Sequence, residues 1–342
     1  MLDFLKRNHL LSGILISSVT IVILFVFIIS LDLYYHKKLS RSAGLNWQGY
    51  RGRVVGEKKK NEIRIVLLGG SCAFGYGALP EVSISSHLEK KLNVLMKANN
   101  IEISVVNLAY NNESAVCYKS TLKSYECLNP DIILLYSGYN DSSPGFSYYR
   151  DENQCFRNSQ IIFRLTGYMP ILPLAIKEKY FKLRYGDIGM GYKEDEVWGV
   201  IERVFSFDLV DKEVLDKKGK LEDAQLEEAA IKSYIGYIDD IFQLCLDKDR
   251  GFIFIRQPWT GKSVFPNRMQ ERLRHHLKKY EGIDKFIYVN LLNIFQKQKP
   301  KEFFVDGLHL TGKGNERVAD ALTKPMISMI LKAFLNNGEE KL

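Results

Sequence analysis

The hydrophobic positions along the chain fall into three kinds of pattern. One long apolar run lies near the N-terminus, and helical stripes alternate with short runs further on. Five of these short runs are continuously apolar and rich in Ile and Val, as expected of parallel strands covered on both faces. They are Arg64–Gly70, Ser104–Ala109, Asp131–Gly138, Gly251–Pro258 and Lys285–Leu292. The alternation predicts an α/β fold, a three-layer α/β/α sandwich around a five-stranded parallel sheet.

Two of the segments between these strands carry apolar positions at helical spacing. The first stripe consists of Ile84, Leu88, Leu92 and Leu95. The second is longer and consists of Leu226, Ala230, Ile231, Tyr234, Ile238, Ile241, Phe242 and Cys245. We interpret both as core faces of helices that cover the sheet. Active groups are then expected at the carboxyl ends of the strands.

The N-terminal apolar run extends from Leu10 to Leu31 without a charged residue. Twenty-two residues at about 1.5 Å each give roughly 33 Å, which is enough to cross a bilayer. A cleavable signal peptide would have a shorter apolar region and a small-x-small cleavage site. Here the run leads instead into Tyr34 and Tyr35, which suit an interfacial belt. Residues 1–35 are therefore predicted to form an uncleaved, single-pass membrane anchor that spans about residues 10–31.

The positive charge of the chain is concentrated around this anchor. Residues 1–60 hold ten Lys and Arg and three Asp and Glu, a net charge of +7, which leaves +1 of the total +8 for the rest. A nearly neutral body argues against nucleic acid as a partner. Residues 36–62 are predicted to be a juxtamembrane linker. Its run Lys58–Lys60 is typical either of attraction to anionic lipid or of a solvated segment.

The predicted catalytic domain covers residues 63–336 and carries an insertion at about 142–220. Such a segment is far longer than the usual connection between elements. It contains Tyr148, Tyr149 and an apolar stretch, residues 161–176, that is broken by prolines. Three uses remain open: a lid over the active site, a substrate groove, or a surface that rests on the bilayer.

The five cysteines are odd in number, and their spacings do not form metal-binding pairs. Neither a disulfide scaffold nor a zinc site is suggested, and no cofactor is predicted. Each cysteine is interpreted as a small buried hydrophobic residue. Cys72 follows Ser71 and could be reactive, but the packing interpretation is preferred there too.

Candidate chemistry lies where the predicted strands end. The first strand stops at Gly69-Gly70-Ser71, and the third ends in Gly138-Tyr139-Asn140-Asp141. Asp306-Gly307-Leu308-His309 precedes the last helix. Each of these signals is weak alone, because glycine-rich turns and Asp-x-x-His pairs are common. Their positions at separate strand ends favour one shared site.

Ester cleavage needs these residue types together. Ser71 is the predicted nucleophile, His309 is the predicted base, and Asp306 holds and stabilises the imidazole. The oxyanion of the tetrahedral intermediate requires donors. The candidates are the backbone N–H of Ser71, the backbone N–H near Asn112, and the side-chain amide of Asn140.

These residues resemble the SGNH (GDSL-type) hydrolases, and more specifically their membrane-anchored bacterial members. Gly69-Gly70-Ser71, Gly138–Asp141 and Asp306–His309 match three of the four motif blocks of that family. The second motif block differs from the family pattern, because Asn112 occupies a position where members usually carry Gly. Asn tolerates a left-handed backbone better than most residues, so its N–H can still serve. The resemblance implies a flavodoxin-like fold, acyl-ester substrates on glycans, lipids or small molecules, and an extracytoplasmic catalytic domain.

Other functions remain open from sequence. A nucleotide-binding interpretation of Gly69–Gly77 fails because the third glycine of the fingerprint is missing. An O-acyltransferase, which transfers the acyl group to a surface polysaccharide instead of water, would use the same residues. A non-catalytic, anchored glycan-binding or assembly protein is the alternative that is not an enzyme. The oligomeric state is not indicated.

Overall fold

The computed structural model describes residues 9–39, 44–142, 151–173, 176, 223–258, 264–296 and 299–332. Five parallel strands form its central sheet in the order β2-β1-β3-β4-β5. Their bounds are β1 Glu62–Gly69, β2 Glu102–Asn107, β3 Ile132–Ser137, β4 Gly251–Arg256 and β5 Phe286–Asn290. The predicted fold class is therefore confirmed. Each predicted strand corresponds to an observed one, with ends that differ by at most two residues.

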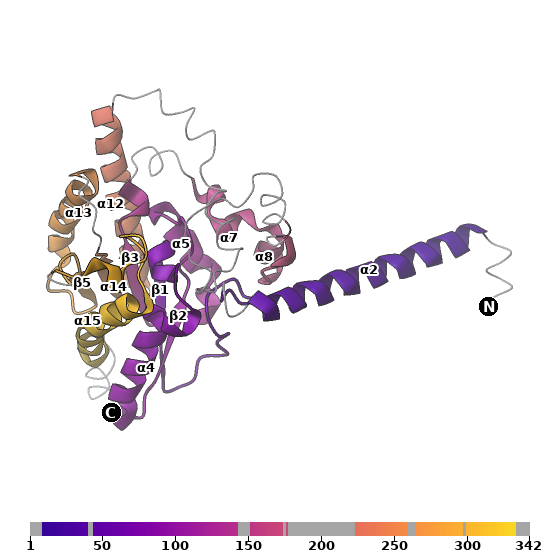
Figure 1. Ribbon diagram of the computed structural model, residues 1–342, viewed down its shortest axis with the longest axis horizontal. Helices are drawn as coiled ribbons and strands as arrows, with labels where there is room; N and C mark the ends of the chain where they lie inside the picture. Colours follow the sequence, from indigo (N-terminus) through magenta and orange to yellow (C-terminus); the bar gives the residue numbers. More distant parts are fainter. Residues whose placement is uncertain are drawn as a thin grey trace.

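Helices cover both faces of the sheet (Figure 1). On one side lie α5 Ala115–Ser124, α12 Asp223–Asp247 and α13 Val264–Leu277, and on the other lie α4 Ile84–Met96 and α15 Gly312–Ile330. Shorter helices are α3 Ser71–Phe74, α7 Phe156–Ser159, α8 Ile161–Thr166 and α14 Pro300–Phe303. Single 3₁₀ turns are η1 Pro80–Val82, η2 Lys97–Asn99, η3 Glu126–Leu128, η4 Asn140–Ser142, η5 Glu152–Gln154 and η6 Lys278–Tyr280.

The two predicted helical stripes pack as expected, with one exception. Every apolar residue named in the α12 stripe is buried, and so are Ile84, Leu88 and Leu92 on α4. The prediction that Leu95 lies on the buried face is wrong, because Leu95 is 51% exposed while Met96 is buried. The stripe of α4 continues in steps of four, which keeps one narrow face against the sheet.

The predicted linker is largely folded onto the body, so that expectation is wrong for residues 44–61. Leu45, Tyr50 and Val55 are buried. The Arg51 backbone N–H donates to the Asn107 carbonyl at the end of β2 (3.0 Å). The sequence did not predict this packing, because the apolar residues of this segment are interspersed with glycine and show neither helical nor strand periodicity.

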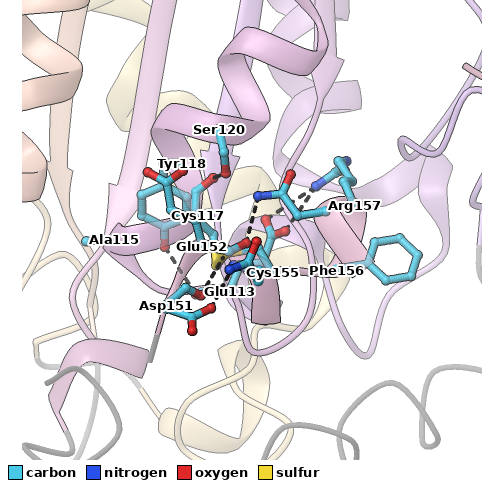
Figure 2. Close-up of a disulfide and its surroundings, with 12 residues drawn as sticks. Glu113, Ala115, Cys117, Tyr118, Ser120, Asp151, Glu152, Cys155, Phe156 and Arg157 are labelled. Atoms are coloured by element: carbon cyan, nitrogen blue, oxygen red, sulfur yellow. Dashed lines mark hydrogen bonds and ion pairs between the residues drawn. A yellow bond between two sulfur atoms is a disulfide. The ribbon is translucent and has the colours of Figure 1, made fainter. Parts of the chain in front are cut away.

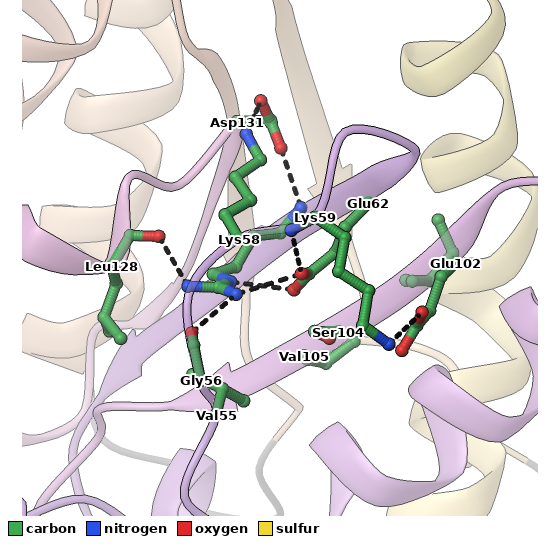
Figure 3. A network of polar contacts seen from close by, with 12 residues as sticks. Val55, Gly56, Lys58, Lys59, Glu62, Glu102, Ser104, Val105, Leu128 and Asp131 are labelled. Atoms are coloured by element: carbon green, nitrogen blue, oxygen red, sulfur yellow. Dashed lines mark hydrogen bonds and ion pairs between the residues drawn. The ribbon is translucent and has the colours of Figure 1, made fainter.

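Paired charges occupy the amino edge of the sheet (Figure 3). The Arg64 guanidinium, 1% exposed as a residue, donates to both carboxylate oxygens of Glu62 (2.8 and 3.0 Å). Lys58 Nζ lies 2.5 Å from Asp131 Oδ1, and Lys59 Nζ lies 2.7 Å from Glu102 Oε2. Lys58 and Lys59 therefore pair with the body of the protein, which neither interpretation of the lysine run anticipated.

One N-terminal helix, α2 His9–Leu39, is long and apolar enough to cross a membrane from Leu11 to Lys38. It projects away from the body (Figure 1). Its last turns bind the described part of the insertion. Asp32 accepts hydrogen bonds from the Ile171 and Leu172 backbone N–H groups (2.9 and 2.5 Å), and from the Tyr168 hydroxyl. Insertion residues 143–150, 174, 175 and 177–222, with Tyr148 and Tyr149, lie outside the described residues.

Candidate active site

Ser71 lies at a sharp change of direction between β1 and α3. Gly70 caps the helix in an extended conformation (φ −87°, ψ −155°), and Ser71 is its first residue. A side chain at position 70 would collide with the Asn140 amide, so glycine allows that amide to approach the serine turn. The Ser71 N–H belongs to the first helical turn, whose N–H groups have no acceptor within the helix.

Ser71, His309 and Asp306 form a chain of hydrogen bonds at the carboxyl edge of the sheet. His309 Nε2 lies 2.8 Å from Ser71 Oγ, although the two residues are 238 positions apart. His309 Nδ1 lies 2.6 Å from Asp306 Oδ2. The other Asp306 oxygen accepts the backbone N–H groups of Leu308 (3.0 Å) and His309 (2.8 Å). The structure therefore brings together all three residues that the sequence nominated.

The charge of Asp306 fixes the hydrogen-bonding roles of this chain. Burial by itself raises the pKa of Asp306, but the hydrogen bonds and charge of His309 outweigh it and hold that pKa below its ordinary value. An ionised carboxylate only accepts, so the proton is assigned to His309 Nδ1. Nε2 then carries the lone pair and faces the Ser71 hydroxyl. This is the arrangement that a general base requires.

Two neighbours of Ser71 further define the site. The Tyr76 ring packs against the His309 imidazole with centroids 4.7 Å apart. Cys72 is buried, and burial, with the charge of Asp306, raises the pKa of its thiol to about 12. A thiol with that pKa is protonated at neutral pH and is a poor nucleophile. The packing interpretation of Cys72 therefore holds.

Of the nominated oxyanion residues, Asn140 approaches the serine turn directly, and Asn112 precedes Glu113, whose carbonyl lies near Gly70. Asn112 adopts the left-handed backbone (φ 58°) that its residue type tolerates. Asn140 Nδ2 donates to the Glu113 carbonyl (2.7 Å), which joins the loop after β3 to the loop after β2. A side-chain amide has two N–H groups, so one bond to Glu113 leaves the second for another acceptor.

A disulfide and a buried ion pair hold the loop after β2 (Figure 2). Cys117 on α5 is bonded to Cys155 in the insertion, which corrects the expectation that these cysteines pack as free thiols. The prediction of a buried side chain is also wrong for Cys127, which is exposed. Arg157 Nη1 lies 3.3 Å from each Glu113 carboxylate oxygen, with both side chains almost fully buried. The Phe156 ring stacks on Tyr110 with centroids 3.7 Å apart.

Several residues near the site were not nominated from sequence. A small pocket beside the serine turn is lined by Gly138, Tyr139, Arg256, Gln257, Asn267 and Gln270, among others. Tyr139 and Gln257 directly adjoin nominated strand ends and could have been found there. Arg256 occupies the last position of β4, where the apolar run merely suggested the end of a strand. Within the described ranges, no cluster of three or more His, Cys, Asp or Glu side chains could hold a metal ion.

No family model and no curated protein sequence matches this chain. Solved structures similar to it include a two-domain esterase active on acetylated mannans (12% identity, 80% of this chain and 50% of that chain, TM-score 0.43). Another is the lipase Lip_vut3 from a goat rumen metagenome (15% identity, covering 77% of this chain and 96% of that chain, TM-score 0.42). A third is a GDSL-like lipase from Bacteroides thetaiotaomicron (13% identity, covering 80% of this chain and 92% of that chain, TM-score 0.38).

This chain spans about half the length of the two-domain esterase and most of the length of the two lipases. At these identities the similarity concerns the fold. The chemistry of the site is therefore argued from its own geometry.

Proposed function

We propose that this protein is a serine esterase that cleaves an acyl ester, an acetyl ester among the candidates, on a glycan or a lipid. The observation that carries the proposal is the unbroken hydrogen-bonded chain from Asp306 through His309 to Ser71. A carboxylate, an oriented imidazole and a hydroxyl in this order are what nucleophilic acyl transfer requires. One solved structure similar to this chain is an esterase active on acetylated mannans.

The proposed reaction follows from these positions. Ser71 Oγ attacks the ester carbonyl while His309 Nε2 takes its proton, and Asp306 stabilises the resulting imidazolium. The Ser71 N–H, the Asn112 N–H and the Asn140 amide are the proposed donors to the oxyanion. The intermediate collapses as His309 returns the proton to the departing alcohol. Water then attacks the acyl-serine by the same route and releases the acid.

We further propose that α2 is a retained anchor and that the catalytic domain lies outside the cytoplasm. The Asp32 contacts with residues 168–172 support retention, because cleavage before Asp32 would cut the helix that they hold. The Cys117–Cys155 disulfide supports the location, since such bonds persist in oxidising compartments.

A fluorophosphonate probe tests the nucleophile. Full-length protein in detergent should be labelled covalently, and the labelled peptide should contain Ser71. The Ser71→Ala variant should not react, and a Ser120→Ala variant serves as the matched control that should react normally. Labelling that persists in Ser71→Ala would assign the nucleophile elsewhere, and an unlabelled native protein would favour a binding protein.

Acyl transfer to a sugar hydroxyl would use the same acyl-serine. Incubation of a model acetyl ester with and without an oligosaccharide acceptor separates the two reactions. Release of free acid at the same rate without acceptor supports hydrolysis. If acylated sugar is the main product when acceptor is present, and free acid forms only when acceptor is absent, the protein is a transferase.

A further inference from the structure

Arg256, the last residue of β4, is a cation beside the candidate site. It is 7% exposed and lines the small pocket beside Tyr139 and Gln257. Among the described residues its guanidinium donates from Nη2 to Asn267 Oδ1 (3.1 Å) and interacts with the Tyr288 hydroxyl. Within the described residues no carboxylate lies within ion-pair distance of it.

Three of the other four buried arginines pair with a carboxylate, and the fourth, Arg51, donates to the carbonyls of Phe74, Gly75 and Ala78. Arg64 bonds both oxygens of Glu62 and two backbone carbonyls. Arg157 bonds both oxygens of Glu113, the Tyr125 hydroxyl and the Gly49 carbonyl. Arg250 pairs with Glu126. A buried cation without an anion is costly, so an anion from outside the described residues would stabilise Arg256.

A buried acceptor lines the same pocket. The Gln270 side chain donates from Nε2 to the Tyr234 hydroxyl (3.0 Å), while its Oε1 has no hydrogen-bond partner among the described atoms. Gly138 is required beside it, because a side chain there would collide with the Gln270 amide. An unsatisfied buried oxygen accepts a hydrogen bond from a hydroxyl group of a ligand.

The pocket adjoins the proposed nucleophile. Gln257 Nε2 lies 4.0 Å from Sγ of Cys72, which follows Ser71. Tyr139 precedes Asn140 in the same loop, and its ring is 38% exposed. Burial, with electrostatic interactions with Cys72 and Asp306, raises the pKa of Tyr139.

We propose that this pocket binds an anionic group of the substrate, a carboxylate or phosphate, through Arg256. Gln270 Oε1 accepts from a neighbouring hydroxyl, and the Tyr139 ring covers one face of the ligand. The ligand class is an acidic sugar unit. The proposal rests on the esterase function for its role in turnover, but binding at Arg256 is independent of the Ser71 chemistry.

Binding to the full-length Ser71→Ala protein in detergent tests the pocket without turnover. Isothermal titration with galacturonate should give a measurable affinity, and galactose at the same concentrations should bind at least tenfold more weakly. Adding Arg256→Gln should remove the preference, whereas Arg256→Lys should retain part of it. Arg272→Gln, on the outer face of α13, is the matched control. Equal binding of both sugars, or a preference that survives Arg256→Gln, overturns the proposal.

Inorganic phosphate in the same titration distinguishes the two sources of negative charge. If phosphate binds more tightly than galacturonate, the natural ligand is a phosphorylated sugar unit. If galacturonate binds more tightly, the natural ligand is a uronate. In the active protein, Arg256→Gln should lower kcat/KM for an acetylated galacturonate about 10- to 100-fold, mainly through KM. Turnover of acetylated galactose should change less than about twofold. Equal losses on both esters would show a merely structural role, whereas absent turnover with intact anion binding would contradict only the esterase function.

A second inference comes from α8. Its side chains Ile161, Ile162 and Leu165 are 64%, 49% and 78% exposed, and only Phe163 on this helix is buried. The chain then reaches residues 168–172, which hold the last turns of α2. Figure 1 shows α8 beside the end of α2 that meets the body.

The surroundings of α8 match a membrane interface. Tyr34 on α2 and Trp47 are 57% and 45% exposed, and the Trp47 carbonyl accepts the Met169 N–H (2.7 Å). Aromatic side chains gather at the headgroup level of bilayers. We infer that the apolar face of α8 inserts into the headgroup region of the bilayer that α2 crosses.

Fluorescence tests this contact in phosphatidylcholine vesicles. In a Cys127→Ser background, an environment-sensitive label at Leu165→Cys should emit at shorter wavelength and be quenched by brominated lipid. The same label at Val94→Cys, an equally exposed apolar position on α4, should remain water-accessible and unquenched. Identical spectra and quenching at both positions would overturn the inference.

Discussion

The two edges of the sheet carry charge in opposite ways. At the amino edge, Arg64 and Glu62 are both buried and satisfy each other, and Lys58 pairs with Asp131 (Figure 3). At the carboxyl edge, Asp306 pairs with His309, while Arg256 contacts the Asn267 amide oxygen and the Tyr288 hydroxyl and has no carboxylate partner among the described residues.

The difference separates structural charge from functional charge. Both edges are formed by the same strands. A charge whose partners all come from the chain stabilises that chain and offers nothing to a ligand. A charge left with too few partners is a place where a ligand adds stability. The predictions below test this contrast, from the largest expected effect to the smallest.

The largest effect is expected at the carboxyl edge. His309→Ala should lower kcat for ester hydrolysis by about 10⁴-fold, because Ser71 loses its base. The midpoint of thermal unfolding should change little, since the site is partly open to solvent. His275→Ala on α13 is the control and should keep full activity. An active His309→Ala protein would remove the imidazole from the mechanism.

At the amino edge the same kind of change should act on stability. Glu62→Ala leaves the Arg64 guanidinium buried and unpaired, which typically costs about 3–5 kcal/mol in the free energy of unfolding. Urea denaturation followed by circular dichroism measures it. Glu102→Ala removes an exposed partner of Lys59 and should cost less than about 1 kcal/mol. A Glu62→Ala protein as stable as the Glu102→Ala protein would break the contrast between the edges.

Asn140→Ala should separate binding from chemistry. Loss of one oxyanion donor typically costs about 3–4 kcal/mol of transition-state stabilisation, so kcat should fall by roughly 10²–10³-fold. KM for a small acetyl ester should stay nearly constant. Steady-state kinetics on the folded variant measure both constants. A raised KM with an unchanged kcat would assign Asn140 to substrate binding instead.

The pH dependence of stability should report the amino edge. Burial alone raises the pKa of Glu62, but the hydrogen bonds from Arg64 outweigh it and lower that pKa from 4.5 to about 2. The native state therefore binds fewer protons than the unfolded state in this range. The stabilisation is complete above the unfolded pKa and is lost as pH falls from about 5 towards 2, by on the order of 2 kcal/mol.

Urea titrations at several pH values measure this loss. The Glu62→Gln variant lacks the titrating group, so its unfolding free energy should fall less steeply over the same range. Parallel pH profiles for the native and Glu62→Gln proteins would assign the acid sensitivity to other carboxyl groups.

The candidate site could be located from sequence because each part adjoins a strand end. Parallel strands carry their carboxyl ends to one edge, so Ser71, Asn112 and Asn140 were bound to gather once β1, β2 and β3 were identified. His309 precedes the last helix, α15, which packs back against the sheet. The fold followed from the same continuous apolar runs.

Other features depend on three-dimensional neighbours that no local pattern records. Cys117 and Cys155 are 38 residues apart, and an odd number of cysteines gave no reason to pair them. Leu45, Tyr50 and Val55 pack individually and without a period. Arg256 gave no signal, because its importance lies in the partners that it lacks, and these are known only once the fold is known.

The contact between α2 and residues 168–172 limits where this protein can work. Only four positions separate the end of α2 at Leu39 from Gly44, so little chain is available to extend. With α2 in a bilayer, the body would diffuse laterally but stay at one height. Encounters with substrate would then be governed by the number of ester groups per unit area of membrane, and esters far above that layer would be out of reach.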